Sequence, residues 1–286
     1  MTERPSQPPD ERASSVHEVE INIDMAPPAR VIDYVDGGVA HFAVDRDVAE
    51  QYIASLPGGV EQFRAVRRAS QAFLERMVHY LAADAGVRQF LVAGWTLAGE
   101  PNVHDLAQAV APTSRVVYLA LDPVQLAHAH ALQSNTADGA IAYIQAKLRH
   151  PDEILRQAAA TLDLAEPVAV VLPTTLMFVR RDETAYWIVA ELMGGLPAGS
   201  YLVITHHADD IFVDEYLEMR RLTERLAAEG KTWGTTPRSH AAVAKFFDGL
   251  DLVEPGLVLQ DEWRPPAGSR PGEYRSATWA AVARKP

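Results

Sequence analysis

The sequence contains no cysteine, which excludes disulfides, thiolate nucleophiles and cysteine-based metal sites. It also has no apolar run of membrane-spanning length, no phosphate-binding loop and no GxSxG nucleophile motif. Basic residues are scarce, since 26 Lys and Arg stand against 38 Asp and Glu, a net charge of −12. Such a chain repels phosphates and anionic lipid, so neither nucleic acid nor a membrane is expected as a partner.

The remaining charged residues give few specific signals. The only dense basic run, residues 64–70, is interpreted as the solvated face of a helix. No spacing of histidines or acids indicates a metal site, and none is predicted. Residues 1–23 are polar and proline-rich, so we expect a disordered tail rather than a signal peptide, and a cytoplasmic protein.

Apolar runs alternate with helical patterns along most of the 286 residues. Strands are predicted at 88–93, 115–121, 140–146, 167–173 and 199–207. Helices are predicted at 102–112, 122–135, 150–162, 183–196, 209–230 and 239–250, before a terminal pair of strands within 252–285. Strands that lack strict alternation and are joined by helices indicate a parallel, doubly wound sheet. Ligands bind such sheets outside the carboxyl ends of the strands.

Several segments resemble, in order and with similar spacing, an actinobacterial family of S-adenosyl-methionine-dependent methyltransferases. They are 27–50, 72–91, 102–112, 121–132, 199–206 and 246–258. The resemblance covers nearly the whole chain from about residue 24. It implies an α/β, Rossmann-like class I methyltransferase fold, with a seven-stranded, mostly parallel sheet and an antiparallel C-terminal strand. We expect an N-terminal helical cap at 24–85 and the α/β domain at 86–286.

The cofactor motifs depart from those of the family. Where members usually read FLDIGTGLPT this chain reads FLVAGWTLAG, so that Val92 replaces an acid and Thr96 a glycine, while Gly94 remains. Ala120 stands where the family has a ribose-binding acid at the end of the second strand, and Gln145 stands where the family has an acid near the adenine. Members of the family often have an Asn-Arg pair before AFL, and this chain has Ser70 and Gln71 in its place.

These replacements predict weak cofactor binding. Each hydrogen bond to a charged group contributes about 1.5–3 kcal/mol, so losing two weakens binding by about 10²- to 10⁴-fold. We therefore expect no cofactor, with Gly94, Trp95 and Gln145 as a vestigial site and Trp95 filling the gap. S-adenosyl-methionine is the alternative.

Polar residues near the strand ends and in the cap motif are the candidate site residues. The candidate catalytic residues are His41, His206, His207, Asp45 and Tyr34. The candidate substrate-binding residues are Arg46, Thr174, Thr175, Met177 and His104. Each histidine taken alone is more often a surface or capping residue than a catalytic base, and the alternative role of the cap motif is to pin the cap by hydrogen bonds and an ion pair.

Three hypotheses for function follow. The first is an enzyme of natural-product metabolism that catalyses cyclisation or elimination of a small molecule by cofactor-independent acid–base chemistry. The second is an atypical S-adenosyl-methionine-dependent methyltransferase of a small molecule. The third is a non-catalytic partner of an active homologue, and the sequence leaves both a homodimer and such a heterodimer open.

Overall fold

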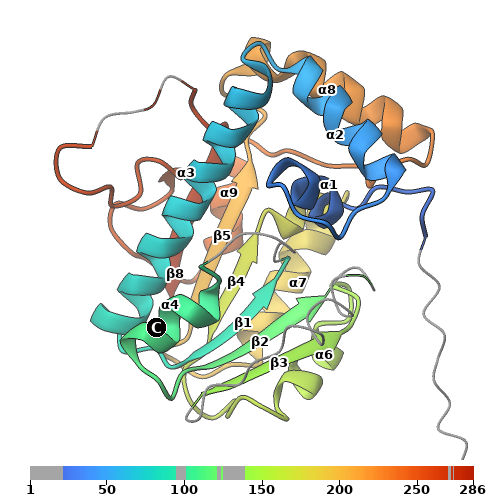
Figure 1. The fold of residues 1–286 in the computed structure, drawn as a ribbon. Helices are drawn as coiled ribbons and strands as arrows, with labels where there is room; N and C mark the ends of the chain where they lie inside the picture. The colour runs from blue at the N-terminus through green and yellow to red at the C-terminus, as the bar shows by residue number, and fades with distance from the viewer. Residues whose placement is uncertain (1–21, 95–100, 121–123, 125–138, 270–271, 273) are drawn as a thin grey trace, which may run out of the picture.

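One sheet organises the protein. The computed structural model describes residues 22–94, 101–120, 124, 139–269, 272 and 274–286, and the arrangement of their helices and strands is shown in Figure 1. The strands are β1 (Gln89–Ala93), β2 (Arg115–Ala120), β3 (Ala140–Gln145), β4 (Ala169–Pro173), β5 (Tyr201–His207), β6 (Asp251–Leu252), β7 (Val258–Leu259) and β8 (Thr278–Arg284). All five residues of β1 are buried, as befits a strand with helices on both faces.

The strand order is β3-β2-β1-β4-β5-β8-β6, with β7 paired to β8 off this path. Strands β1 to β5 are parallel, and β8 runs antiparallel to β5, from Tyr201 opposite Arg284 to His207 opposite Thr278. The predicted seven-stranded, mostly parallel sheet with an antiparallel last strand is confirmed, and β7 adds a short eighth strand. The chain order reverses between β1 and β4, which makes their carboxyl ends the expected ligand site.

Helices cover both faces of the sheet. They are α1 (Pro28–Val35), α2 (Ala43–Ser55), α3 (Gly59–His79), α4 (Val103–Val110), α6 (Pro151–Ala158), α7 (Asp182–Gly194), α8 (Val213–Ala228) and α9 (His240–Ala244), with short turns η1 (Tyr80–Asp84), η2 (Thr175–Phe178) and η3 (Lys245–Phe247). Apolar residues of α6, α7 and η3 pack on one face, and those of α3, η1 and α4 pack on the other. None of the helices in the described ranges combines the length and hydrophobicity that a bilayer crossing requires.

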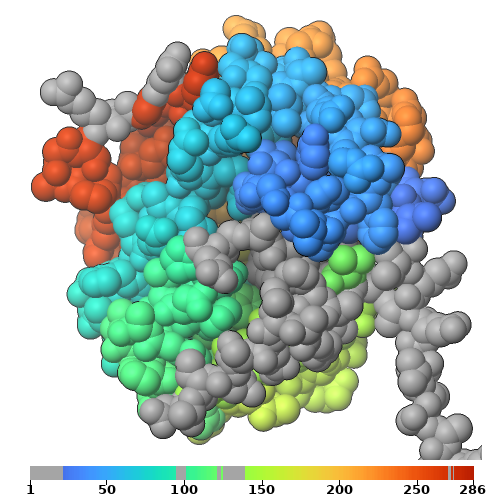
Figure 2. Space-filling model, in the orientation of Figure 1, coloured from blue at the N-terminus to red at the C-terminus, as the bar shows by residue number. Residues whose placement is uncertain are grey.

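The N-terminal helices form a cap whose apolar core includes residues of α8. Val31 of α1 and Val48 of α2 pack against Leu222 and Leu226 of α8, and Figure 1 shows α2 and α8 side by side. The space-filling view in Figure 2 shows α1, α2 and α3 as one continuous surface that borders α8. The cap predicted at 24–85 therefore shares its core with a helix from the segment predicted as the second domain. Most of the predicted tail, residues 1–21, lies outside the described residues.

Candidate functional site

A cavity of about 560 Å³ lies between the cap and the carboxyl ends of β1, β4 and β5. This volume falls within the range of about 300–1,000 Å³ that is usual for small-molecule and cofactor sites. Its walls come from α1, α2 and α3 of the cap, from α8, from the loop 232–237 and from residues 276–278. The sheet contributes Val92, Tyr118, Pro173, Thr205 and His207 to the floor. The cavity thus occupies the switch point of the sheet, where the topology predicts a ligand.

The end of β1 leaves the sheet through Gly94, whose φ of +87° favours glycine. A Cβ at this position would overlap the hydroxyl of Thr175. That hydroxyl is fixed, because it donates to the carbonyl oxygen of Ala93 at 2.6 Å. Both Gly94 and Thr175 line the cavity, whereas Trp95 and Thr96 lie outside the described residues. The glycine that the sequence retains is therefore required by the local packing at this strand end.

A hydrogen-bonded group joins the end of β2 to the start of α4. The Tyr118 hydroxyl accepts the backbone N–H of His104 at 3.1 Å and lies 2.9 Å from Nδ1 of the same histidine. Nε2 of His104 in turn lies 3.3 Å from Oδ1 of Asp105. Burial raises the pKa of Tyr118 far above its usual range, so its hydroxyl stays protonated. His104, predicted to bind substrate, is not among the described residues of the cavity wall and contacts that wall at Tyr118.

Two of the three acid positions of the family motifs are apolar in this structure. Val92 and Ala120 are each 1% exposed, at the ends of β1 and β2. Gln145, the last residue of β3, is exposed and is not part of the cavity wall among the described residues. Among the described residues, those at the β1 end offer a ligand hydrocarbon and the hydroxyls of Tyr118 and Thr175 rather than a carboxylate.

The two histidines at the end of β5 point to different environments, as neighbours on a strand must. His207 lines the cavity, and burial together with the nearby Arg220 lowers the pKa of its imidazole to about 4. This imidazole makes no hydrogen bond to any other described side chain or backbone group. His207 is therefore an uncharged imidazole, free to bond a ligand at neutral pH.

His206 is turned away from the cavity and is fully buried. Its Nε2 lies 3.1 Å from the carbonyl oxygen of Thr236 and 3.2 Å from Nη1 of Arg238. Burial and the charge of Arg238 lower the pKa of His206 to about 3. Arg238 also donates to the carbonyl oxygens of Leu176 and Val179, so this group holds the loop 232–238 against η2.

The four predicted site residues of the cap lie away from the cavity wall. Nδ1 of His41 lies 2.9 Å from Oδ2 of Asp33, and the Tyr34 hydroxyl donates to Glu50 at 3.1 Å. Asp45 accepts the backbone N–H of Phe42 at 2.7 Å and forms a buried ion pair with Arg30 at 3.4 Å. Arg46 is exposed on α2. The structure thus does not bring these cap residues together with the β5 histidines.

Other predicted residues do reach the cavity, and several lining residues escaped prediction. Thr174 and Met177 line it as expected from their place after β4. The unpredicted lining residues include Tyr52, Phe63, Arg67, Tyr216, Arg220, Trp233 and Phe178. Trp233 and Phe178 meet edge to face, with ring centroids 5.3 Å apart. Most of these side chains are aromatic, so the half of the cavity beneath α8 is suited to an apolar or aromatic molecule.

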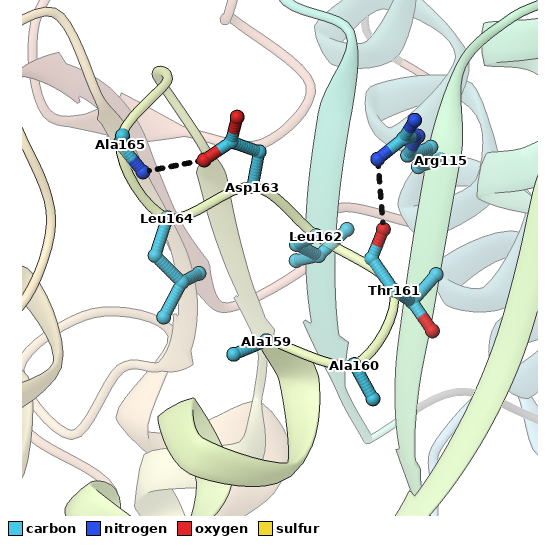
Figure 3. A pocket seen from close by; sticks show the side chains of 8 residues that line it. All are labelled: Arg115, Ala159, Ala160, Thr161, Leu162, Asp163, Leu164 and Ala165. Atoms are coloured by element: carbon cyan, nitrogen blue, oxygen red, sulfur yellow. Dashed lines mark hydrogen bonds between the residues drawn. The ribbon is translucent and has the colours of Figure 1, made fainter.

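A second hollow lies at the opposite edge of the sheet, around Arg115 at the start of β2 and residues 159–165. Figure 3 shows that its polar contacts serve the loop itself, with Arg115 donating to the Thr161 carbonyl and Ala165 to Asp163. It is shallow and open, and it faces the amino ends of the strands, so we do not assign it a ligand. Within the described ranges, no group of three or more His, Asp or Glu side chains is arranged to hold a metal ion.

Two solved structures are similar to this chain over nearly its whole length. A DUF574 family protein from Streptomyces avermitilis is 36% identical, with coverage of 93% of this chain and 100% of its own and a TM-score of 0.82. A candidate methyltransferase from Thermobifida fusca is 29% identical, with coverage of 92% and 96% and a TM-score of 0.79. Among curated proteins, none matches the sequence.

The match to a family profile indicates which cofactor to expect. The profile described as S-adenosyl methyltransferase matches residues 14–286, which is almost the entire chain. This match contradicts the expectation of no cofactor and indicates S-adenosyl-methionine instead. That expectation gave too much weight to the loss of the acids at positions 92 and 120. It also favours the methyltransferase hypothesis over cofactor-independent cyclisation or elimination. The chain belongs to the S-adenosyl methyltransferase family.

Proposed function

We propose that the protein transfers the methyl group of S-adenosyl-methionine to an oxygen or nitrogen atom of a small apolar or aromatic molecule. The observation that carries the proposal is the single cavity that runs from Gly94 at the end of β1 to His207 at the end of β5. The cap and α8 close over this cavity, which favours a small molecule over a macromolecular substrate.

The residues at the β1 end fit the cofactor. The Thr175 hydroxyl occupies the position that a Cβ at Gly94 would take, and without a side chain the backbone there can approach a ligand closely. Asn102, Tyr118 and Thr175 provide neutral polar groups, while Val92 and Val103 provide hydrocarbon. When bound there, S-adenosyl-methionine supplies an electrophilic methyl group on a sulfonium. The described side chains beside Gly94 are neutral and largely apolar, so they would stabilise the sulfonium cation less than water does, which favours transfer of its methyl group.

His207 is the residue we assign to the methyl acceptor. A neutral imidazole accepts a hydrogen bond from an O–H or N–H group and so directs the lone pair of the acceptor atom. The low pKa keeps His207 uncharged, so it does not repel the cationic cofactor. As the acceptor gains the methyl group it loses its proton, which the imidazole receives and passes to water.

The first test is binding. Calorimetry with S-adenosyl-methionine and S-adenosyl-homocysteine should give saturable heat, and incubation with aromatic alcohols and amines should produce S-adenosyl-homocysteine and a methylated product. His207→Gln should lower turnover by about 10²- to 10⁴-fold, the usual range for a lost acid–base group, with little change in cofactor affinity. The matched control is His79→Gln, because His79 is exposed and is not part of the cavity wall. A protein that binds neither cofactor form would refute the proposal and leave a non-catalytic partner as the better reading.

A further inference from the structure

The basic run on α3 contains one arginine that does not face solvent. Arg64 and Arg68 are exposed, as expected of a solvated helix face. Arg67 instead lines the cavity and its side chain is only 21% exposed, compared with 52% for Arg64. It shares the inward face of α3 with Ser70 and Gln71, one turn further along the helix. The interpretation of the whole run as a solvated face is therefore wrong at Arg67.

Several N–H groups of the Arg67 guanidinium have no hydrogen-bond partner among the described residues. Its Nη2 donates to Oδ2 of Asp36 at 2.9 Å, at the end of α1. Its Nε is buried without a hydrogen-bond partner among the described residues, and Nη1 bonds to none of them either. A guanidinium has five N–H groups in a planar fork that suits a carboxylate. One carboxylate, that of Asp36, occupies only part of this fork.

Arg67 also lies close to the cofactor end of the cavity. Nε2 of Gln71, one turn away, donates at 2.8 Å to the carbonyl oxygen of Pro101, immediately before α4. The only other cation in the described wall is Arg220, whose N–H groups already bond the carbonyl oxygens of Ala208 and Asp209. Of these two cations in the described wall, Arg67 has the larger share of its N–H groups without a partner among the described residues.

S-adenosyl-methionine carries one anionic group, the carboxylate of its amino-acid end. On the basis of the proposed function, we propose that Arg67 binds this carboxylate. Such an anchor explains how the site holds the cofactor although Val92 and Ala120 stand where the family has acids. The protein would then bind the amino-acid end of the cofactor more strongly than the ribose of the cofactor.

The proposal predicts that affinity depends on the amino-acid end of the ligand. Calorimetry would compare S-adenosyl-homocysteine with methylthioadenosine, which has the nucleoside and the thioether but no carboxylate. In Arg67→Gln, the dissociation constant for S-adenosyl-homocysteine should rise by about 10- to 100-fold, as for a lost charged hydrogen bond, and that for methylthioadenosine should stay the same. Arg67→Lys should restore part of the affinity. Arg64→Gln, one turn earlier and exposed, should change neither constant.

A further variant separates binding from cap stability. Asp36→Asn breaks the ion pair but keeps the guanidinium, so S-adenosyl-homocysteine should bind as in the wild type or more tightly. Equal weakening of both ligands by Arg67→Gln, or equal loss in Asp36→Asn, would overturn the inference and make the pair a structural one. An unchanged constant for S-adenosyl-homocysteine in Arg67→Gln would overturn it as well. A wild type that binds neither ligand would instead refute the proposed function, and this inference with it.

Discussion

The hydroxyl of Thr175 donates to the carbonyl oxygen of Ala93 at 2.6 Å and so ties the turn after β4 to the end of β1. Both residues are almost fully buried, at 1% and 3% exposure. The two strands meet where the strand order reverses, so this bond fixes the floor of the cavity at its central point. Thr175, predicted as a substrate contact, lines the cavity and has this positioning role.

Replacing Thr175 by valine should destabilise the protein by about 1–3 kcal/mol, because it leaves the Ala93 carbonyl buried without its donor. Urea unfolding measures the change. Thr235→Val is the control, since Thr235 also lines the cavity but makes no hydrogen bond with the described residues, and it should stay within about 0.5 kcal/mol. Equal losses in the two variants would contradict the role of the bond.

Gly94→Ala should destabilise the protein and weaken cofactor binding. A left-handed φ of +87° costs a residue with a Cβ about 1–2 kcal/mol, and the added carbon also displaces the Thr175 hydroxyl. Thermal unfolding and calorimetry with S-adenosyl-homocysteine measure the two effects. Gly194→Ala is the control, because a Cβ at the end of α7 meets no atom within 4 Å, and it should be neutral or slightly stabilising. Wild-type behaviour of Gly94→Ala would show that the strand end adapts.

His206 should make stability depend on pH in the acid range. The pKa of His206 in the folded state is about 3, below the ordinary value of 6.5. Between these pH values the unfolded chain binds a proton on this imidazole and the folded protein does not. Stability from this group is complete above pH 6.5 and falls as the pH drops towards 3. Between pH 7 and pH 5 the wild type should lose about 2 kcal/mol more than His206→Gln in urea unfolding. His79→Gln, at an exposed position, should follow the wild type, and parallel curves for His206→Gln would exclude the effect.

Arg238 should control the order of the loop 232–238. It is 2% exposed and donates to the carbonyl oxygens of Leu176 and Val179 and to the carboxylate of Asp182. Arg238→Met should cost more than about 3 kcal/mol, because two buried carbonyls lose a charged donor. Hydrogen exchange should then accelerate in the loop that carries Trp233. Arg180→Met, nearby and exposed, should leave exchange unchanged.

The strands were predictable because buried parallel strands are apolar on both faces. The run 88–93 became β1 at 89–93, and 199–207 became β5 at 201–207. The predicted helix at 209–230 begins only at Val213, since Phe212 adopts a φ of +48° that no local pattern signals. The predicted helix at 122–135 lies outside the described residues, apart from Val124.

The site was predictable only where a strand leads into it. Thr174 and His207 follow from the rule that ligands bind at the carboxyl ends of parallel strands. Alternation along β5 shows that only one of His206 and His207 faces the cavity, but the choice between them depends on which face the cap covers. The contributions of Arg67 and Trp233 depend on how α3 is rotated and on a loop without periodicity, so the sequence does not reveal them.

Because α2 and α8 share a core, the cap cannot be separated from the α/β segment without exposing apolar side chains. A chain that started at residue 86 would keep every strand of the sheet but would expose Leu222 and Leu226, which the cap now buries. We expect such a fragment to aggregate rather than to fold, in spite of its complete sheet. We infer that the two segments are one folding unit, so that under the proposed function a methyl acceptor would enter through movement of loops rather than through opening of the cap as a separate lobe.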